Sequence, residues 1–267
     1  MSNQYQNGGS SILYKREIWT CVLTLVLITF SFSPLVHAFD YSDVPGLIDD
    51  GDTFYEQGRY QEALDMYDKA LSLFPKSPYD LYAWNGRGHA LYYLGRYQEA
   101  LDAYDKALLI SPDFPFAWNG KGNVLYSLGR YQEALDAYNK ALSINTGYVY
   151  AWNGKGDALL HLGRNQEALD AYNKALSLNA EYSYAWNGKG VALENLGKNQ
   201  EALVAYDKAL SIDPNYGSAK SNKERLLAKT GTPKTLWDRN ILIYLILLVF
   251  VVLLGALVYD TYYKKGK

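Results

Sequence analysis

The sequence of 267 residues is poor in cysteine, and its one cysteine, Cys21, lies in an apolar stretch near the N-terminus. A single cysteine excludes a disulfide within the chain and any metal site built from several thiolates. An excess of basic residues is also missing. Residues 39–235, between two apolar stretches, hold 20 Lys and Arg against 25 Asp and Glu. This mildly acidic segment has no basic stripe, so we expect no nucleic-acid binding.

Signatures of catalysis and of metal binding are missing as well. The recurring phrase Asn-Gly-Lys-Gly lacks the spacing of a phosphate-binding loop, and no G-x-S-x-G nucleophile elbow is present. His89 and His161 lie far apart and outside any H-E-x-x-H pattern. The sequence therefore predicts a protein that is not an enzyme, with no catalytic residue, no cofactor and no metal site.

The first apolar stretch has the composition of a secretory signal peptide. Lys15 and Arg16 precede an uncharged run over residues 18–38, and Val36-His37-Ala38 ends it with small side chains around one larger residue. A positive start, an apolar centre and a small-x-small end are typical of a signal that is removed. We expect cleavage after Ala38, and the alternative is that residues 1–38 remain as an N-terminal anchor.

The second apolar stretch, residues 241–259, contains no charged residue and predicts a C-terminal transmembrane helix. Aromatic residues lie near both of its ends, and three lysines follow in the basic tail 260–267. With either interpretation of the first stretch, the segment between the two lies outside the cytoplasm and the tail lies inside. We therefore expect a cell-membrane protein, single-pass after signal cleavage, that contacts the lipid bilayer through residues 241–259.

Between these stretches the sequence repeats itself. Tryptophan recurs every 34 residues, each time within Ala-Trp-Asn-Gly-Lys/Arg-Gly, and each copy closes with Lys-Ala-Leu. The tryptophans are Trp84, Trp118, Trp152 and Trp186. A fixed period of this length predicts a stack of repeated units.

Each unit has the pattern of two helices. In one copy, the first helix is expected from near Trp118 to Leu128-Gly129, a helix stop, and the second over about 131–144. Five apolar residues of the second helix fall on one face at helical spacing: Ala134, Leu135, Tyr138, Ala141 and Leu142. A single hairpin cannot cover both of its faces, so neighbouring units must cover them.

These residues resemble the tetratricopeptide repeat, a helical hairpin of 34 residues with Trp, Gly, Ala, an aromatic residue and Ala at fixed places. In one copy the matching residues are Trp118, Gly122, Ala134, Tyr138 and Ala141. The resemblance implies an all-α fold, an α-solenoid of tetratricopeptide helical hairpins ahead of the C-terminal transmembrane helix. It covers residues 44–216 in five units: 44–77, 81–114, 115–148, 149–182 and 183–216.

The sequence departs from the family pattern in two ways. The first unit has Leu47 where the tryptophan belongs, and an additional glycine precedes the packing glycine at positions 86, 120, 154 and 188. Glycine inside a helix costs about 1 kcal/mol relative to alanine, so packing between units must hold these helices. Residues 217–229 are expected to form a polar capping helix, followed by a linker over residues 230–240.

The resemblance implies an interaction scaffold that binds a protein or peptide along the concave face of the stack. The places expected to face the partner form an aromatic row and an amide row: Tyr82, Phe116, Tyr150 and Tyr184, with Asn85, Asn119, Asn153 and Asn187. The alternative is that the rings only pack against neighbouring repeats and that each asparagine caps or solvates its helix. Amides can bond an extended backbone whatever its sequence, because each offers both a donor and an acceptor. The alternative is a glycan- or cell-envelope-binding accessory protein, since aromatic rings also stack on sugars. The sequence leaves the oligomeric state open.

Overall fold

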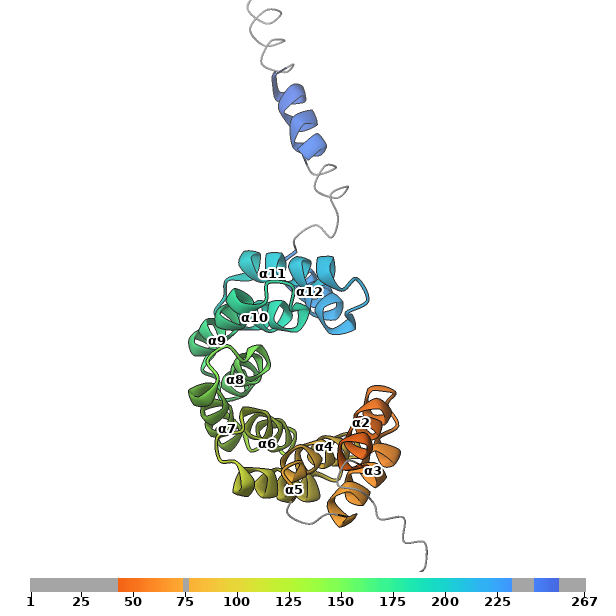
Figure 1. The fold of residues 1–267 in the computed structure, drawn as a ribbon. Helices are drawn as coiled ribbons and strands as arrows, with labels where there is room; N and C mark the ends of the chain where they lie inside the picture. The colour runs from red at the N-terminus through yellow and green to blue at the C-terminus, as the bar shows by residue number, and fades with distance from the viewer. Residues whose placement is uncertain (1–42, 74–76, 232–242, 255–267) are drawn as a thin grey trace, which may run out of the picture.

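The computed structural model describes residues 43–73, 77–231 and 243–254. In these ranges every regular element is a helix, and consecutive helices pair as antiparallel hairpins that stack into an arc (Figure 1). The hairpins are α2 (Asp43–Glu56) with α3 (Tyr60–Leu73), α4 (Asp80–Tyr93) with α5 (Tyr97–Ile110), α6 (Pro115–Ser127) with α7 (Tyr131–Ile144), α8 (Val149–His161) with α9 (Asn165–Leu178), and α10 (Ser183–Asn195) with α11 (Asn199–Ile212), and α12 (Gly217–Thr230) follows them. The predicted all-α solenoid is confirmed.

The two helices of a unit lie on different sides of the arc. The first helices, α4, α6, α8 and α10, line the inner side, and the second helices lie outside them (Figure 1). The apolar face predicted for the second helix is buried, and Gln132, Glu133 and Lys140 on its other face are exposed. Burial of this face from water stabilises each unit against its neighbours.

Each first helix ends where its Leu-Gly pair predicts a stop. Gly129 has a φ of +74°, a left-handed conformation that other residues rarely adopt. Its amide donates to the Tyr126 carbonyl, and the amide of Arg130 donates to the Leu125 carbonyl. These two bonds satisfy carbonyl groups that a helix end leaves without partners.

The start of the first helix differs from the expectation. Helix α6 begins at Pro115, three residues before Trp118, because Phe114 is extended and the fixed φ of proline suits the first turn. Phe116 and Asn119 therefore both lie within the helix. At the other end of the stack, α12 continues to Thr230, and Gly231, with a φ of +65°, ends it.

The buried tyrosine of each second helix explains the additional glycine. A Cβ atom added to Gly88, in the same unit as Tyr104, would lie 2.7 Å from its ring, and one added to Gly120 of the next unit would lie closer still. Both distances are far below van der Waals contact. The same pair of glycines encloses Tyr67, Tyr138 and Tyr172, so two glycines per unit make room for one aromatic ring.

The predictions for the two ends of the chain fall mostly beyond the described residues. The signal peptide or anchor over 1–38, most of the linker and the tail 260–267 lie outside them. Of the predicted transmembrane segment, residues 243–254 are described and form a helix. Among the helices that the structure describes, none combines the length and the apolar character needed to cross a bilayer.

Candidate partner-binding face

The four aromatic residues predicted to face a partner are open to solvent. Tyr82, Phe116, Tyr150 and Tyr184 are 46–60% exposed. Each contacts an aromatic ring at the end of its unit or at the start of the next helix, at centroid distances of 4.9–5.9 Å. With these neighbours they form one continuous line of rings, here called the aromatic row: Tyr82, Phe114, Phe116, Tyr148, Tyr150, Tyr182, Tyr184 and Tyr216.

The four asparagines of the amide row lie deeper than the rings. Asn119 is only 5% exposed, and its side-chain oxygen has no hydrogen-bond partner. The Oδ1 atoms of Asn85 and Asn153 are likewise buried and without a partner. An unpaired buried polar atom costs about 1–3 kcal/mol, so these asparagines reduce the stability of the fold.

The amide row ends differently at Asn187. Its Oδ1 accepts a hydrogen bond of 3.0 Å from Nδ2 of Asn222 in α12. In the 34-residue register, the place of Asn222 is taken in the earlier units by Gly120, Gly154 and Gly188, which have no side-chain donor. This exchange of asparagine for glycine explains why three oxygens of the row are unpaired and the fourth is not.

One turn beyond the amide row, a second set of inner residues binds the buried tyrosines. The Tyr138 hydroxyl donates to Oδ1 of Asn123 at 2.8 Å, and the Tyr172 hydroxyl donates to Oδ1 of Asp157 at 2.6 Å. The residue type at this place varies along the stack, with His89 and Val191 in two of the other units. Its constant spacing of 15 residues from a buried tyrosine was the signal that could have shown the structural role.

Asp157 has the most perturbed carboxyl group of this face. Burial raises its pKa to about 6, against the opposing effect of hydrogen bonds from Tyr172 and from Nδ2 of Asn153 at 2.9 Å. At the equivalent place, burial lowers the pKa of His89 to about 4, so this imidazole is neutral at physiological pH. No group of three or more potential ligands in the described ranges could hold a metal ion.

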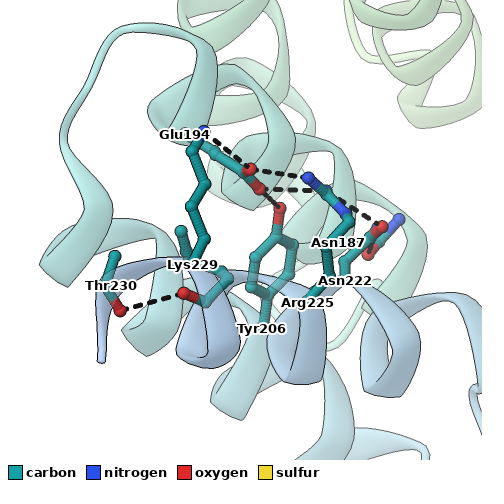
Figure 2. Close-up of polar contacts among 8 residues, drawn as sticks. Asn187, Glu194, Tyr206, Asn222, Arg225, Lys229 and Thr230 are labelled. Atoms are coloured by element: carbon teal, nitrogen blue, oxygen red, sulfur yellow. Dashed lines mark hydrogen bonds and ion pairs between the residues drawn. The ribbon is translucent and has the colours of Figure 1, made fainter. Parts of the chain in front are cut away.

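In the last unit, a carboxylate and the capping helix form a polar cluster (Figure 2). Val191 cannot accept a hydrogen bond, and the Tyr206 hydroxyl donates instead to Glu194 at 3.2 Å. Arg225 of α12 donates to both oxygens of Glu194, at 2.7 and 3.0 Å, and Lys229 lies 4.0 Å away. The Glu194 side chain is 6% exposed and therefore depends on these cations for compensation of its charge.

Near the end of the first helix, Tyr93, His161 and Asn195 each contact the first residue of the preceding second helix, and the chemistry of this pair changes along the stack. Tyr93 stacks on Tyr60 with centroids 4.7 Å apart, and His161 stacks on Tyr131 at 4.4 Å. One unit later, Nδ2 of Asn195 donates to Oδ1 of Asn165 at 3.1 Å. The inner edge is thus aromatic towards the N-terminus and amide-rich towards the C-terminus.

Stacked helical hairpins with a constant period of 34 residues, lined on the inner side by the first helices, define an α-solenoid repeat protein. Models described as tetratricopeptide repeat match residues 51–112, 85–149, 149–182 and 183–216, which together run without a gap. The chain belongs to the tetratricopeptide repeat family.

Solved structures of this family have the same fold. A tetratricopeptide repeat protein of Thermus thermophilus, TTC0263, superposes with a TM-score of 0.60 at 21% identity, over 69% of this chain and 99% of that one. One from Parabacteroides merdae gives 0.59 at 21% identity, over 71% and 74%. YrrB, described as a tetratricopeptide repeat protein with an unusual peptide-binding site, gives 0.53 at 25% identity, over 72% and 97%. No curated protein sequence matches the chain.

Proposed function

We propose that the chain is a membrane-anchored interaction scaffold that binds a protein or peptide segment along the inner face of the arc. The amide row is the observation that carries this proposal. Three of its oxygens make no hydrogen bond, so each of them is an acceptor that a ligand can use. An extended peptide supplies alternating donors and acceptors, which is the chemistry that a row of amides matches.

Two further observations support a peptide ligand. The aromatic row runs beside the amides and is half exposed, and rigid rings lose little conformational entropy when they bind. The similarity to YrrB, whose description names a peptide-binding site, supports a peptide as the class of ligand.

The test replaces Asn119 and Asn153 together with alanine. Because both oxygens are unpaired and alanine favours helices, we expect thermal stability to stay unchanged or to rise. Capture of partners from a detergent extract by crosslinking should fall. The matched control replaces Asn139 and Asn173, which are exposed on second helices, and should leave capture unchanged. Intact capture by the folded Asn119→Ala/Asn153→Ala variant would place the binding face elsewhere.

A glycan or cell-envelope polymer is the second candidate ligand. The observation in its favour is the continuous aromatic row, because exposed rings can stack on the faces of sugars. A glycan array and a protein pull-down with the same purified chain separate the two candidates. Retention on glycans without any protein partner supports the glycan hypothesis, and the reverse supports the scaffold.

The membrane part of the proposal assigns residues 1–38 as a signal segment and residues 241–259 as a single span, with the repeats outside the cytoplasm. It is supported by the helix 243–254, whose side chains are all large and apolar or aromatic and are 47–71% exposed, with no cover from the described chain. To test it, Gln132, which is exposed, is replaced by cysteine in a Cys21→Ser background. A membrane-impermeant maleimide should label this variant on intact cells. Labelling only after lysis contradicts the topology.

A further inference from the structure

The inner face contains two partly or fully buried carboxylates, and only one of them has a cation. Glu194 is paired with Arg225 and lies near Lys229. Asp157 is partly exposed on α8 and is bonded only to the neutral groups of Tyr172 and Asn153. Within the described chain, no lysine, arginine or histidine pairs with it. A half-buried negative charge without a cation is costly, and an incoming cation would remove that cost.

The pair of Glu194 and α12 shows how the inner face binds a covering segment. The segment gives one side-chain amide to the amide row, from Asn222 to Asn187, and one guanidinium to the nearby carboxylate, from Arg225 to Glu194 (Figure 2). One unit earlier, Asn153 and Asp157 have the same two groups, an unpaired amide oxygen and a carboxylate. No residue of the described chain donates to that amide oxygen or places a cation beside that carboxylate.

We infer that Asp157 determines specificity by binding a lysine or arginine side chain of the peptide that lies on the amide row. This inference rests on the proposed function and names the chemistry of its ligand. A guanidinium or ammonium group would donate to the two lone-pair positions that Tyr172 and Asn153 leave open on the Asp157 oxygens.

The other units cannot provide the same site. At the place of Asp157 they have His89, which is neutral, Asn123, which is uncharged, and Val191, which is apolar. Asp52 holds this place in the first unit, but it is exposed, so water already solvates its charge. A basic side chain is therefore selected at one point of the stack, and this fixes the register of the ligand on the otherwise repetitive amide row.

The test measures binding of fluorescein-labelled, end-blocked random decapeptide pools to the full chain in detergent by fluorescence anisotropy. In each pool, one fixed position carries arginine, lysine, citrulline or norleucine. We expect the arginine and lysine pools to bind about tenfold more tightly than the two uncharged pools, since a charged hydrogen bond contributes about that factor. The preference should weaken as salt is raised.

Variants of the carboxylate separate this inference from the proposed function. Asp157→Asn should erase the preference for basic pools, Asp157→Glu should keep part of it, and Asp170→Asn, which removes an exposed carboxylate from α9, should leave it unchanged. Thermal unfolding checks that each variant is folded. Pools that bind without a basic preference, or a preference that survives in Asp157→Asn, overturn this inference and leave the scaffold standing. Absence of binding by every pool contradicts the scaffold, and this inference with it.

Discussion

At the scale of single residues, the helix stability lost at glycine is offset by the burial of tyrosine. Two glycines inside a helix cost about 2 kcal/mol in helix propensity relative to alanine. They admit a tyrosine ring such as that of Tyr104, which is 1% exposed. Complete burial of an aromatic ring stabilises the fold by about the same amount or more. The glycines therefore favour folding only while the ring fits between both of them.

Two alanine substitutions test this balance, because we expect one to lower and the other to raise the free energy of unfolding. In Gly120→Ala, the added methyl group would overlap the Tyr104 ring, and overpacking should lower stability by about 1–3 kcal/mol. In Gly46→Ala, on an exposed part of α2, the methyl group meets nothing within 4 Å, and stability should rise by about 0.5–1 kcal/mol. Urea unfolding measures both variants. Shifts of the same sign would contradict the role given to the glycine–tyrosine contacts.

At the scale of helices, α12 is held by charge as well as by apolar burial. Leu226 and Leu227 are buried, and Arg225 forms two hydrogen bonds to the nearly inaccessible Glu194. The glutamate replaces, at a different place in α10, the acceptor that Val191 cannot provide for Tyr206. The end of the stack therefore has a polar arrangement that no earlier unit contains within the described ranges.

Removal of Arg225 alone should lower the stability of the fold more than removal of both charges of its pair with Glu194. Arg225→Ala leaves the Glu194 carboxylate buried with only Tyr206 and Lys229, whose Nζ lies 4.0 Å away, and we expect a loss of stability of about 1–3 kcal/mol with faster hydrogen exchange in α12. The double variant Glu194→Gln/Arg225→Ala should recover part of this loss. The control, Arg130→Ala, breaks an exposed pair with Glu133 and should leave stability nearly unchanged. Additive effects of Glu194→Gln and Arg225→Ala would contradict the coupling.

How far the sequence predicts these elements depends on whether a contact is repeated. Period and apolar spacing predict the hairpins, the helix stops at Leu-Gly and the buried face of Ala134 and Tyr138, because every unit repeats them. Gly122, which the resemblance assigns to the fixed glycine place of the family pattern, does lie at a close contact, because an added Cβ would be 2.6 Å from the Tyr138 ring. The contact of Arg225 with Glu194 occurs once and joins residues 31 apart, so no periodic pattern could reveal it.

The sequence predicts which helices carry the candidate binding face, but it does not predict how exposed each of its residues is. Helical spacing places the aromatic and amide rows on the inner helices, yet it does not tell that Tyr150 is 60% exposed and Asn119 only 5%. That difference arises from packing between neighbouring first helices, which a spacing argument within one helix does not contain.

At the scale of the whole molecule, stability should grow with the number of complete units, because each unit packs only against its neighbours. Insertion of a second copy of residues 115–148 after position 148 keeps two glycines around each of Tyr67, Tyr104, Tyr138 and Tyr172 and around the added tyrosine. We expect a higher thermal midpoint and a larger radius of gyration, measured by circular dichroism and small-angle scattering. Insertion of residues 131–148 alone, a second helix without its partner, should lower the midpoint. Equal effects of the two insertions would contradict nearest-neighbour stacking.

The enclosure of Tyr67, Tyr104, Tyr138 and Tyr172 by glycines of two successive units also gives the stack a direction. In each of these pairs of units the following helix brings a glycine, whereas after the last tyrosine, Tyr206, the 34-residue register has Asn222 of the capping helix. One residue of the following helix thus distinguishes the two cases: it is glycine where another repeat follows and asparagine where the capping helix follows. In chimeras assembled from such units, we expect a helix with glycine at this place to be followed by further units and a helix with asparagine to end the stack. The stack could then be lengthened or shortened by changing this residue together with the helix that carries it.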